Sequence, residues 1–328
     1  MNIYINFNLC VGPDQQPDRS DGERLSSASV LSLRQVLEQQ LQAVSVCRST
    51  STMNNYRTAM RSLFSYLGHD IPLSSLDSLI IAGYERWLKQ QGICLNTVSC
   101  YMRSLRSLLA LADNSLKEIF GKVYTGTART EKRSVSADDV GRLKTLQLPE
   151  GSFLELSRDV FLFSFYAMGM PFVDVAHLRQ HQIANGQMVY NRHKTGQRVL
   201  VAIEQPMLDI IRRHAARATA DYVFPLLHQG TDREYRIVLG HYNRALHRLA
   251  VLSEIGEKLT SYVVRHTWAS TAYSANVDLP VISKALGHAN TQTTLTYIRE
   301  IDDHRVAAAN HNIIGLVAQT DAERELES

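Results

Sequence analysis

Residue types that suit phosphate chemistry gather in the carboxy-terminal half of this 328-residue chain. His288 follows Gly287, and Tyr297 lies nine residues after that histidine. Arg265 and Lys194 stand upstream of them. A phenol can act as nucleophile and leaving group at phosphorus. Fixed arginine, lysine and histidine donors stabilise the extra negative charge of a pentavalent phosphorus.

Each of these residues also has an ordinary structural role when it is considered alone. A tyrosine is usually a core or surface residue, and a histidine on a turn is usually solvated. An arginine can form a salt bridge within its helix, and a lysine on a hairpin turn usually serves solubility. The spacing of these residues is therefore the informative feature. The helices and turns that carry them decide which of the side chains can meet.

The spacing predicts a helix that begins near Leu279 and ends at Gly287, because glycine adopts the left-handed conformation that closes many helices. The histidine then lies on the turn. Asn290 or Thr291 offers an N-cap for a following helix. The tyrosine falls about two turns into that second helix.

This pattern resembles the carboxy-terminal signature of the tyrosine recombinases, also called the phage integrase family. That signature contains His-x-x-Arg, then Leu-Gly-His, then a nucleophilic tyrosine nine residues later. Here the stretch Leu286–His288 and Tyr297 keep the spacing, and Arg265 precedes them in the sequence Arg-His-Thr. The resemblance covers roughly residues 30–315.

The resemblance implies a role for each residue of the pattern. Tyr297 would be the nucleophile, and His288 would form a hydrogen bond with a non-bridging oxygen of the scissile phosphate. Arg265 would bind the same phosphate in a bidentate manner. Lys194 matches the mobile lysine that protonates the leaving oxygen in this family.

Two further residues occupy positions of the family pattern; the first matches it and the second departs from it. Asp174 matches the acidic residue that orients the active-site arginines, and its alternative is a carboxylate on a helix surface. Tyr262 stands where the family has the histidine of His-x-x-Arg. A phenol is a poor base near neutral pH, so this residue is expected to position Tyr297 or the phosphate.

One catalytic arginine of the family has no counterpart in the pattern. It usually follows Gly-x at the end of a buried helix, where this chain has Pro171; some relatives carry it three residues earlier, where this chain has Met168. Arg158 and Arg179 are the nearest arginines, and neither matches. Loss of a phosphate-binding arginine should cost a few kcal/mol of transition-state stabilisation.

Composition predicts an ordinary globular protein of the cytoplasm. The cysteines Cys10, Cys47, Cys94 and Cys100 lack metal-ligand spacing and are expected to be reduced thiols. No apolar run approaches the roughly 18 to 20 residues that span a membrane, and Met1–Cys10 lacks the features of a signal peptide. We expect neither a cofactor nor a metal ion.

The charge is distributed unevenly along the chain. Residues 30–125 carry 10 Lys and Arg against 6 Asp and Glu, and residues 126–315 carry 22 against 18. Both ends are acidic. A modestly basic body is typical of a nucleic-acid-binding protein, although an ordinary basic protein would have the same charge.

The sequence predicts five segments. Their expected bounds are a disordered lead-in at 1–28, a helical core-binding domain at 29–123, a linker at 124–134, a catalytic domain at 135–315 and an acidic tail at 316–328.

The core-binding domain is expected to consist of four short helices with arginines on their exposed faces. Helices are predicted at 30–45, 52–67 and 76–91, and a fourth is capped by Asn96 or Thr97. A plain helical bundle with solvated arginines is the alternative. The candidate DNA-binding residues are Arg57, Arg61, Arg103 and Arg106, together with Lys132 and Arg133 of the linker.

The catalytic domain is predicted to be mostly helical with one small β-sheet, so the fold class is mainly α. A long apolar helix is expected at 154–170, followed by another at 172–178. Strands at 188–190 and 198–203 flank a glycine-containing turn that carries Lys194. Further helices are expected at 207–217 and 235–255.

These features favour a site-specific DNA recombinase that cuts and rejoins strands through a 3′-phosphotyrosine intermediate and a Holliday junction. The expected partners are double-stranded DNA and a homotetramer on paired sites, with no membrane. The alternative is a cleavage-deficient DNA-binding protein of the same fold, and a type IB topoisomerase-like enzyme fits the compact layout less well.

Overall fold

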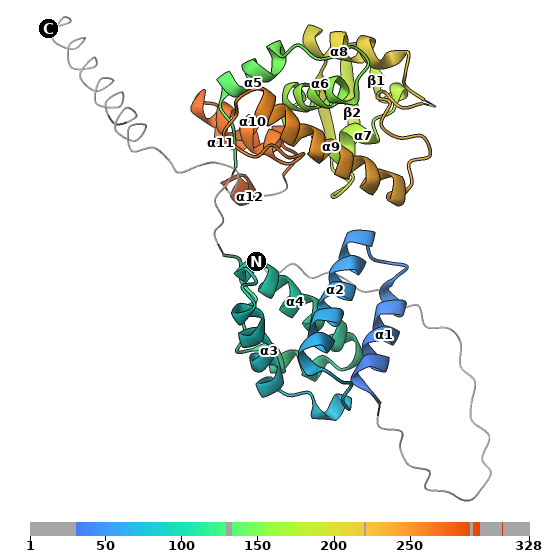
Figure 1. The fold of residues 1–328 in the computed structure, drawn as a ribbon, viewed down its shortest axis with the longest axis vertical. Helices are drawn as coiled ribbons and strands as arrows, with labels where there is room; N and C mark the ends of the chain where they lie inside the picture. The colour runs from blue at the N-terminus through green and yellow to red at the C-terminus, as the bar shows by residue number, and fades with distance from the viewer. Residues whose placement is uncertain (1–30, 129–132, 220, 289–290, 296–309, 311–328) are drawn as a thin grey trace, which may run out of the picture. The chain divides into compact units, whose positions relative to one another are not determined.

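A computed structural model describes residues 31–128, 133–219, 221–288, 291–295 and 310. The chain divides after Ala128 into two compact units, and each is described by itself (Figure 1). Tyr297, Lys132 and the two predicted end segments at 1–28 and 316–328 lie outside the described residues.

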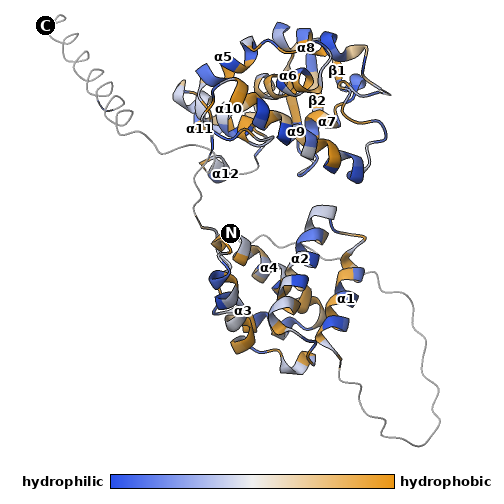
Figure 2. Cartoon of the chain, in the orientation of Figure 1, coloured by the Kyte–Doolittle hydropathy of each residue, from blue (hydrophilic) through white to orange (hydrophobic). Residues whose placement is uncertain are grey.

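The first unit is helical. Its elements are α1 (Leu33–Val44), α2 (Thr50–Leu67), η1 (Leu73–Ser75), α3 (Ser78–Gln90), α4 (Leu95–Ala112) and η2 (Asn114–Phe120). Apolar residues at helical spacing line the inward faces, as Figure 2 shows. Leu63, Tyr84 and Leu105 are fully buried there. The prediction of four main helices is confirmed.

The start of α4 differs from the prediction. Cys94 is its N-cap, two residues before the expected Asn96. The amide of Asn96 is used elsewhere: it donates to the carbonyl oxygen of Ala128 at 3.0 Å and accepts from the N–H of the same residue at 2.8 Å. The side chain therefore anchors the end of this unit.

The second unit contains a small sheet among helices. Its elements are α5 (Ala137–Thr145), α6 (Phe153–Tyr166), α7 (Phe172–Ala176), η3 (Gln180–Gln182), β1 (Ile183–Ala184), β2 (Gln187–Asn191), β3 (Arg198–Ala202), α8 (Gln205–Ala215), α9 (Asp232–Leu252), α10 (Val263–Ser274), α11 (Leu279–Ala285) and α12 (Thr291–Leu295). The strands are antiparallel in the order β1-β2-β3, and Tyr190 pairs with Val199. The fold is mainly α with a small sheet, as predicted.

Helix α6 ends earlier than its apolar sequence predicted. The prediction extended it to residue 170, whereas it ends at Tyr166. Met168 and Gly169 have left-handed φ values of 57° and 68°, which no right-handed helix accommodates. This turn lets the chain pass closely over α10: a Cβ at Gly169 would lie 3.0 Å from the Cα of Arg265.

No helix in the described part of the chain is long and apolar enough to cross a membrane.

Gly169→Ala tests this close approach, with Gly186→Ala as a matched control. Both glycines have positive φ, but a Cβ at Gly186 would meet nothing within 4 Å. We expect Gly186→Ala to lower the free energy of unfolding by about 1 kcal/mol through backbone strain alone. Gly169→Ala should cost about 1–3 kcal/mol more, because the new methyl group meets backbone. Equal losses in denaturant unfolding would contradict the close approach.

Candidate active site

The turn that ends α11 supplies the backbone carbonyl groups to which the side chains of the candidate site bind. Gly287 has a φ of 62°, as predicted from its type. Its N–H donates to the carbonyl oxygen of Lys284 at 2.9 Å, and the N–H of His288 donates to that of Ser283 at 3.0 Å. This pair of bonds is a Schellman motif. The carbonyl oxygens of Leu286 and Gly287 remain available to side chains.

Arg265 uses one of these carbonyls. It lies in the first turn of α10, and its side chain is buried. Nη1 donates to the carbonyl oxygen of Gly169 at 3.0 Å, and Nη2 donates to that of Leu286. Nη2 also lies 3.1 Å from Nε2 of His288. The structure thus brings together the arginine and the histidine that the sequence pattern singled out.

The protonation state of His288 follows from its two partners. A guanidinium only donates hydrogen bonds, so Nε2 accepts from Arg265. Nδ1 then carries the proton of the neutral ring and donates to Oγ1 of the buried Thr294 in α12 at 2.8 Å. Burial, together with the charges of Arg265 and Arg192, lowers the pKa of His288 to about 4. The imidazole is therefore neutral at pH 7.

Arg192 is the site residue that the sequence analysis missed. Its Nη1 donates to the carbonyl oxygens of Leu286 at 2.9 Å and Gly287 at 3.2 Å. The side chain is only 9% exposed, and its Nε is buried without a hydrogen-bond partner among the described residues. Two guanidinium groups therefore converge on the single carbonyl oxygen of Leu286.

A sequence signal for Arg192 existed in the strand before it. Side chains alternate between the two faces of a strand, and Met188 and Tyr190 of β2 are buried. Arg192 follows in the same alternation and so shares the inward face. A charged residue at a strand end is usually solvated, which is why it was not selected.

Asp174 lies beside this second arginine. It is buried in α7, so the alternative of a surface carboxylate is wrong. Its Oδ2 lies 3.8 Å from Nε of Arg192, and its Oδ1 accepts from the N–H of His193 at 2.8 Å. Burial raises the pKa of Asp174, and the peptide N–H of His193 and the charge of Arg192 oppose that rise.

Lys194 lies on the turn between β2 and β3, as predicted, and its side chain is exposed. Tyr262 precedes α10, one helical turn before Arg265, and is 52% exposed. Its ring packs edge-on against that of His266, with centroids 4.9 Å apart.

The two arginines considered for the missing position lie elsewhere. Nη2 of Arg179 donates to the hydroxyl of Tyr222 at 2.9 Å, and its guanidinium lies 3.7 Å from the centre of that ring. Arg158 pairs with the buried Asp159 and donates to the carbonyl oxygen of Leu146. Neither has a partner in the cluster formed by Arg265, His288 and Arg192.

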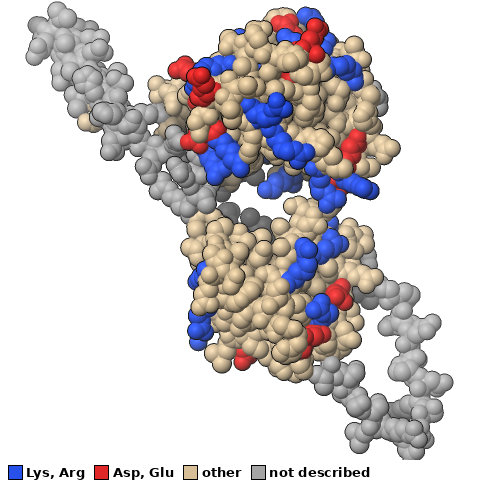
Figure 3. All heavy atoms as spheres, viewed as in Figure 1, with Lys and Arg blue, Asp and Glu red and all other residues tan. Residues whose placement is uncertain are grey.

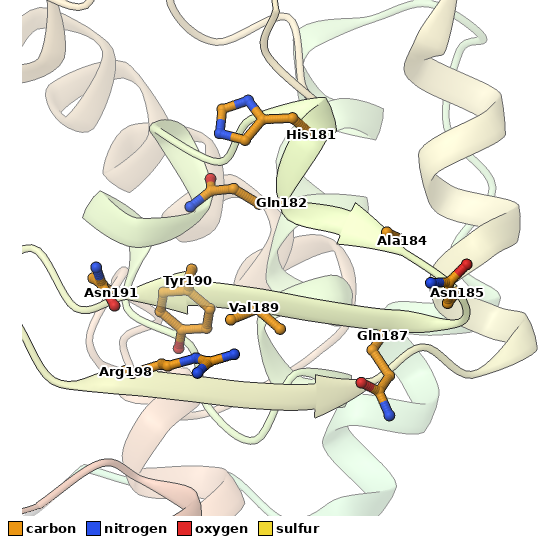
Figure 4. Close-up of a pocket in the computed structure, with 9 residues that line it drawn as sticks. All are labelled: His181, Gln182, Ala184, Asn185, Gln187, Val189, Tyr190, Asn191 and Arg198. Atoms are coloured by element: carbon orange, nitrogen blue, oxygen red, sulfur yellow. The ribbon is translucent and has the colours of Figure 1, made fainter.

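Two surface pockets have linings that do not include Arg265, His288 or Arg192. A pocket of about 580 Å³ lies against the sheet (Figure 4), and it is lined by His181, Asn191 and Arg198 among others. A second pocket of about 620 Å³ surrounds Arg158 and Asp159. Within the described residues, no group of His, Cys, Asp and Glu side chains could hold a metal ion.

Four of the candidate DNA-binding arginines lie on helices, and Arg133 lies in the segment before α5. Arg57 and Arg61 of α2 and Arg103 of α4 are exposed, Arg106 is half-buried, and Arg133 is exposed. Figure 3 shows groups of basic side chains on both units. Helix α9 adds exposed arginines that the sequence analysis did not select: Arg233, Arg236, Arg244 and Arg248.

Residues 143–304 match the phage integrase family, and residues 32–117 match the phage integrase SAM-like domain. Together the two matches take in most of the chain. Tyrosine recombinase XerC of Syntrophus aciditrophicus is 23% identical over 272 residues, which is 76% of this chain and 87% of the relative.

Two solved structures share the fold. A lambda integrase tetramer bound to a Holliday junction has a TM-score of 0.65 at 14% identity, covering 84% of this chain and 81% of that one. The Tn1549 transposon integrase in complex with transposon right end DNA also has a TM-score of 0.65 at 14% identity, covering 87% and 100%.

The electrostatics of the cluster can be tested by titrating His288 with NMR. We expect a midpoint near 4, below the ordinary value of about 6.5. Arg192→Gln removes one of the charges that disfavour protonation, so the midpoint should rise toward 6.5. Arg179→Gln, the matched control outside the cluster, should leave it unchanged. A midpoint near 6.5 in the unsubstituted protein would contradict the described contacts.

Proposed function

The chain belongs to the phage integrase family of tyrosine recombinases, and we propose that it is a site-specific DNA recombinase of the cytoplasm. It cuts and rejoins DNA strands through a 3′-phosphotyrosine intermediate. The observation that carries the proposal is the convergence of Arg265, Arg192 and the neutral His288 on the turn at Leu286 and Gly287. The two fixed guanidinium groups suit the charge that develops on a phosphate during strand cleavage, and His288 accepts a hydrogen bond from one of them.

The two arginines divide their donors between anchoring and binding. A guanidinium has five N–H donors, and the bonds to backbone carbonyls fix the position of each group before DNA arrives. Other donors of Arg192, together with the charge of Arg265, stabilise the non-bridging oxygens of the scissile phosphate. Fixing the groups in advance favours the transition state, because no reorganisation is needed at the moment of reaction.

Arg192 takes the role of the arginine that Pro171 displaces. It reaches the site from the strand end of β2, not from the turn after α6, and Asp174 lies beside it. Because Arg192 supplies the missing charge, the site is complete enough for strand cleavage, which argues against a protein that only binds DNA. It also makes an arginine at Met168 unnecessary.

The reaction also uses groups that are not part of this cluster. The phenol of Tyr297 gives up its proton to solvent as its oxygen attacks phosphorus, and the bond from phosphorus to the 5′ oxygen breaks. Lys194 gives its proton to that leaving oxygen. The 5′-hydroxyl of a partner strand later attacks the phosphotyrosine and releases the phenol. Tyr262 positions the nucleophile or the phosphate.

The partners follow from the same proposal. Both units bind double-stranded DNA through exposed arginines, including Arg57, Arg61 and Arg103, with Lys132 and Arg133 of the linker contributing. The protein acts as a homotetramer on paired sites and passes through a Holliday junction. The lambda integrase tetramer supports this assembly by its similar fold.

The proposed activity can be tested with a nicked suicide DNA substrate that traps covalent protein. The unsubstituted chain should form an adduct on a cognate site, and Tyr297→Phe should form none while its DNA affinity stays within about twofold, because only the nucleophilic oxygen is lost. An adduct in Tyr297→Phe would move the nucleophile elsewhere. DNA binding without any adduct in the unsubstituted chain would favour the binding-only alternative.

The role of Arg192 can be tested by comparing it with Arg179. In single-turnover cleavage, Arg192→Ala should be slower by about 10²–10³-fold, the usual effect of removing one transition-state donor. Arg192→Lys keeps the charge but loses the planar fork, so its rate should be intermediate. Arg179→Ala should cleave normally. The reverse order, a slow Arg179→Ala and a normal Arg192→Ala, would contradict the proposal.

A further inference from the structure

The turn that carries Lys194 needs an external support. Bonds within the hairpin fix its shape: the N–H of Arg192 donates to the carbonyl oxygen of Gln197, and the N–H of Gly196 donates to that of Arg192, both at 2.8 Å. Residues 193–196 are exposed. Internal bonds cannot determine where the tip of a two-stranded ribbon points, so contacts with other elements must do so.

Arg192 anchors the start of the turn to Leu286 and Gly287, and His193 adds external contacts directly beside the lysine. Its N–H donates to Oδ1 of Asp174 at 2.8 Å. Its ring stacks on that of His177, with centroids 5.3 Å apart and planes 23° from parallel. His177 is the residue that ends α7, and its Nδ1 donates to the carbonyl oxygen of Val173 at 2.8 Å. The position of the His177 ring is thereby fixed.

A continuous row of rings extends from His177 into α9. The His177 ring lies 5.5 Å from that of Tyr235, and Tyr235 lies 6.0 Å from Phe172. Phe172 in turn stacks on the buried Tyr242 at 4.1 Å and 10°. Helices α7 and α9, which carry the rings of Phe172, Tyr235 and Tyr242, pack against each other (Figure 1). The row ties the lysine turn to the buried core of the second unit.

We infer that His177 is a positioning residue for Lys194, acting through its ring stack on His193. The inference rests on the proposed function, in which Lys194 protonates the leaving 5′ oxygen. Without the ring of His177, the turn keeps its backbone bond to Asp174 but loses its only ring contact among the described residues. The lysine then spends less time within reach of the leaving oxygen, and proton transfer slows.

A substrate with a sulfur-bridged 5′ position separates this role from general structural support. A thiolate leaves without protonation, because a thiol is far more acidic than an alcohol. Cleavage of that substrate therefore does not need Lys194, while cleavage of the ordinary oxygen-bridged substrate does. The ratio of the two single-turnover rates reports on proton delivery alone and cancels losses of folding, DNA binding or nucleophile alignment.

His177→Ala should slow cleavage of the oxygen-bridged substrate on the order of tenfold, the scale of one lost aromatic contact. The sulfur-bridged substrate should be cleaved at the rate of the unsubstituted protein. His177→Phe keeps a stacking ring and should cleave both substrates at the rates of the unsubstituted protein. His177→Asn keeps a hydrogen-bond donor without a ring and should behave like His177→Ala. The matched control is His181→Ala, because the ring of His181 pairs with Asp221. This variant should change neither rate.

Two outcomes would overturn the inference while the proposed function stands. One is equal slowing of both substrates by His177→Ala, which would mean a purely structural role. The other is no change in either rate. Lys194→Ala separates these from a failure of the proposed function: it should slow only the oxygen-bridged substrate. If Lys194→Ala slows both or neither, the lysine is not the proton donor, and the role of His177 falls with it.

Discussion

The carbonyl oxygen of Leu286 accepts hydrogen bonds from two guanidinium groups, and the candidate site depends on this shared acceptor. It is available because the Schellman turn ends α11 and leaves that carbonyl without a helical partner. Arg265 and Arg192 are far apart in sequence. Two like charges repel each other, and the backbone carbonyls together with the nearby Asp174 offset that repulsion.

Left-handed glycines make this arrangement possible at two places. Gly287 closes the turn, and a Cβ there would lie 2.9 Å from Cδ of Arg192. Gly169 brings its own carbonyl oxygen to Arg265 and leaves no room for a side chain against α10. Backbone geometry, set by residues with no functional group, therefore positions both arginines.

Much of the fold could be predicted from the sequence because it follows from periodicity. Apolar spacing gave the main helices of both units, and alternation around a glycine turn gave β2 and β3. The errors lie where local chemistry overrides the pattern. Helix α6 stops at Tyr166 because two left-handed residues follow, and Asn96 is not a cap because its amide holds Ala128.

The candidate site was only partly predictable, for a different reason. His288 and Arg265 belong to a spaced pattern that a single sequence displays, and the structure brings them into contact. Arg192 belongs to no such pattern. Its role depends on contacts with Leu286 and Gly287, which lie 94 and 95 residues away. Strand alternation alone places Arg192 on the inward face, but its role at the site follows only from these distant contacts, which the fold creates.

Both arginines are proposed to stabilise the charge on the scissile phosphate. A substrate with a methylphosphonate linkage in place of that phosphate tests this role. That linkage lacks the negative charge on one non-bridging oxygen, so it needs one cationic donor fewer. The measurement is the ratio of single-turnover cleavage rates between the unsubstituted protein and Arg192→Ala on the two linkages. We expect a large ratio on phosphate that falls close to one on methylphosphonate. An equally large ratio on both linkages would contradict the proposed role, because Arg192 would then support the fold and not the phosphate.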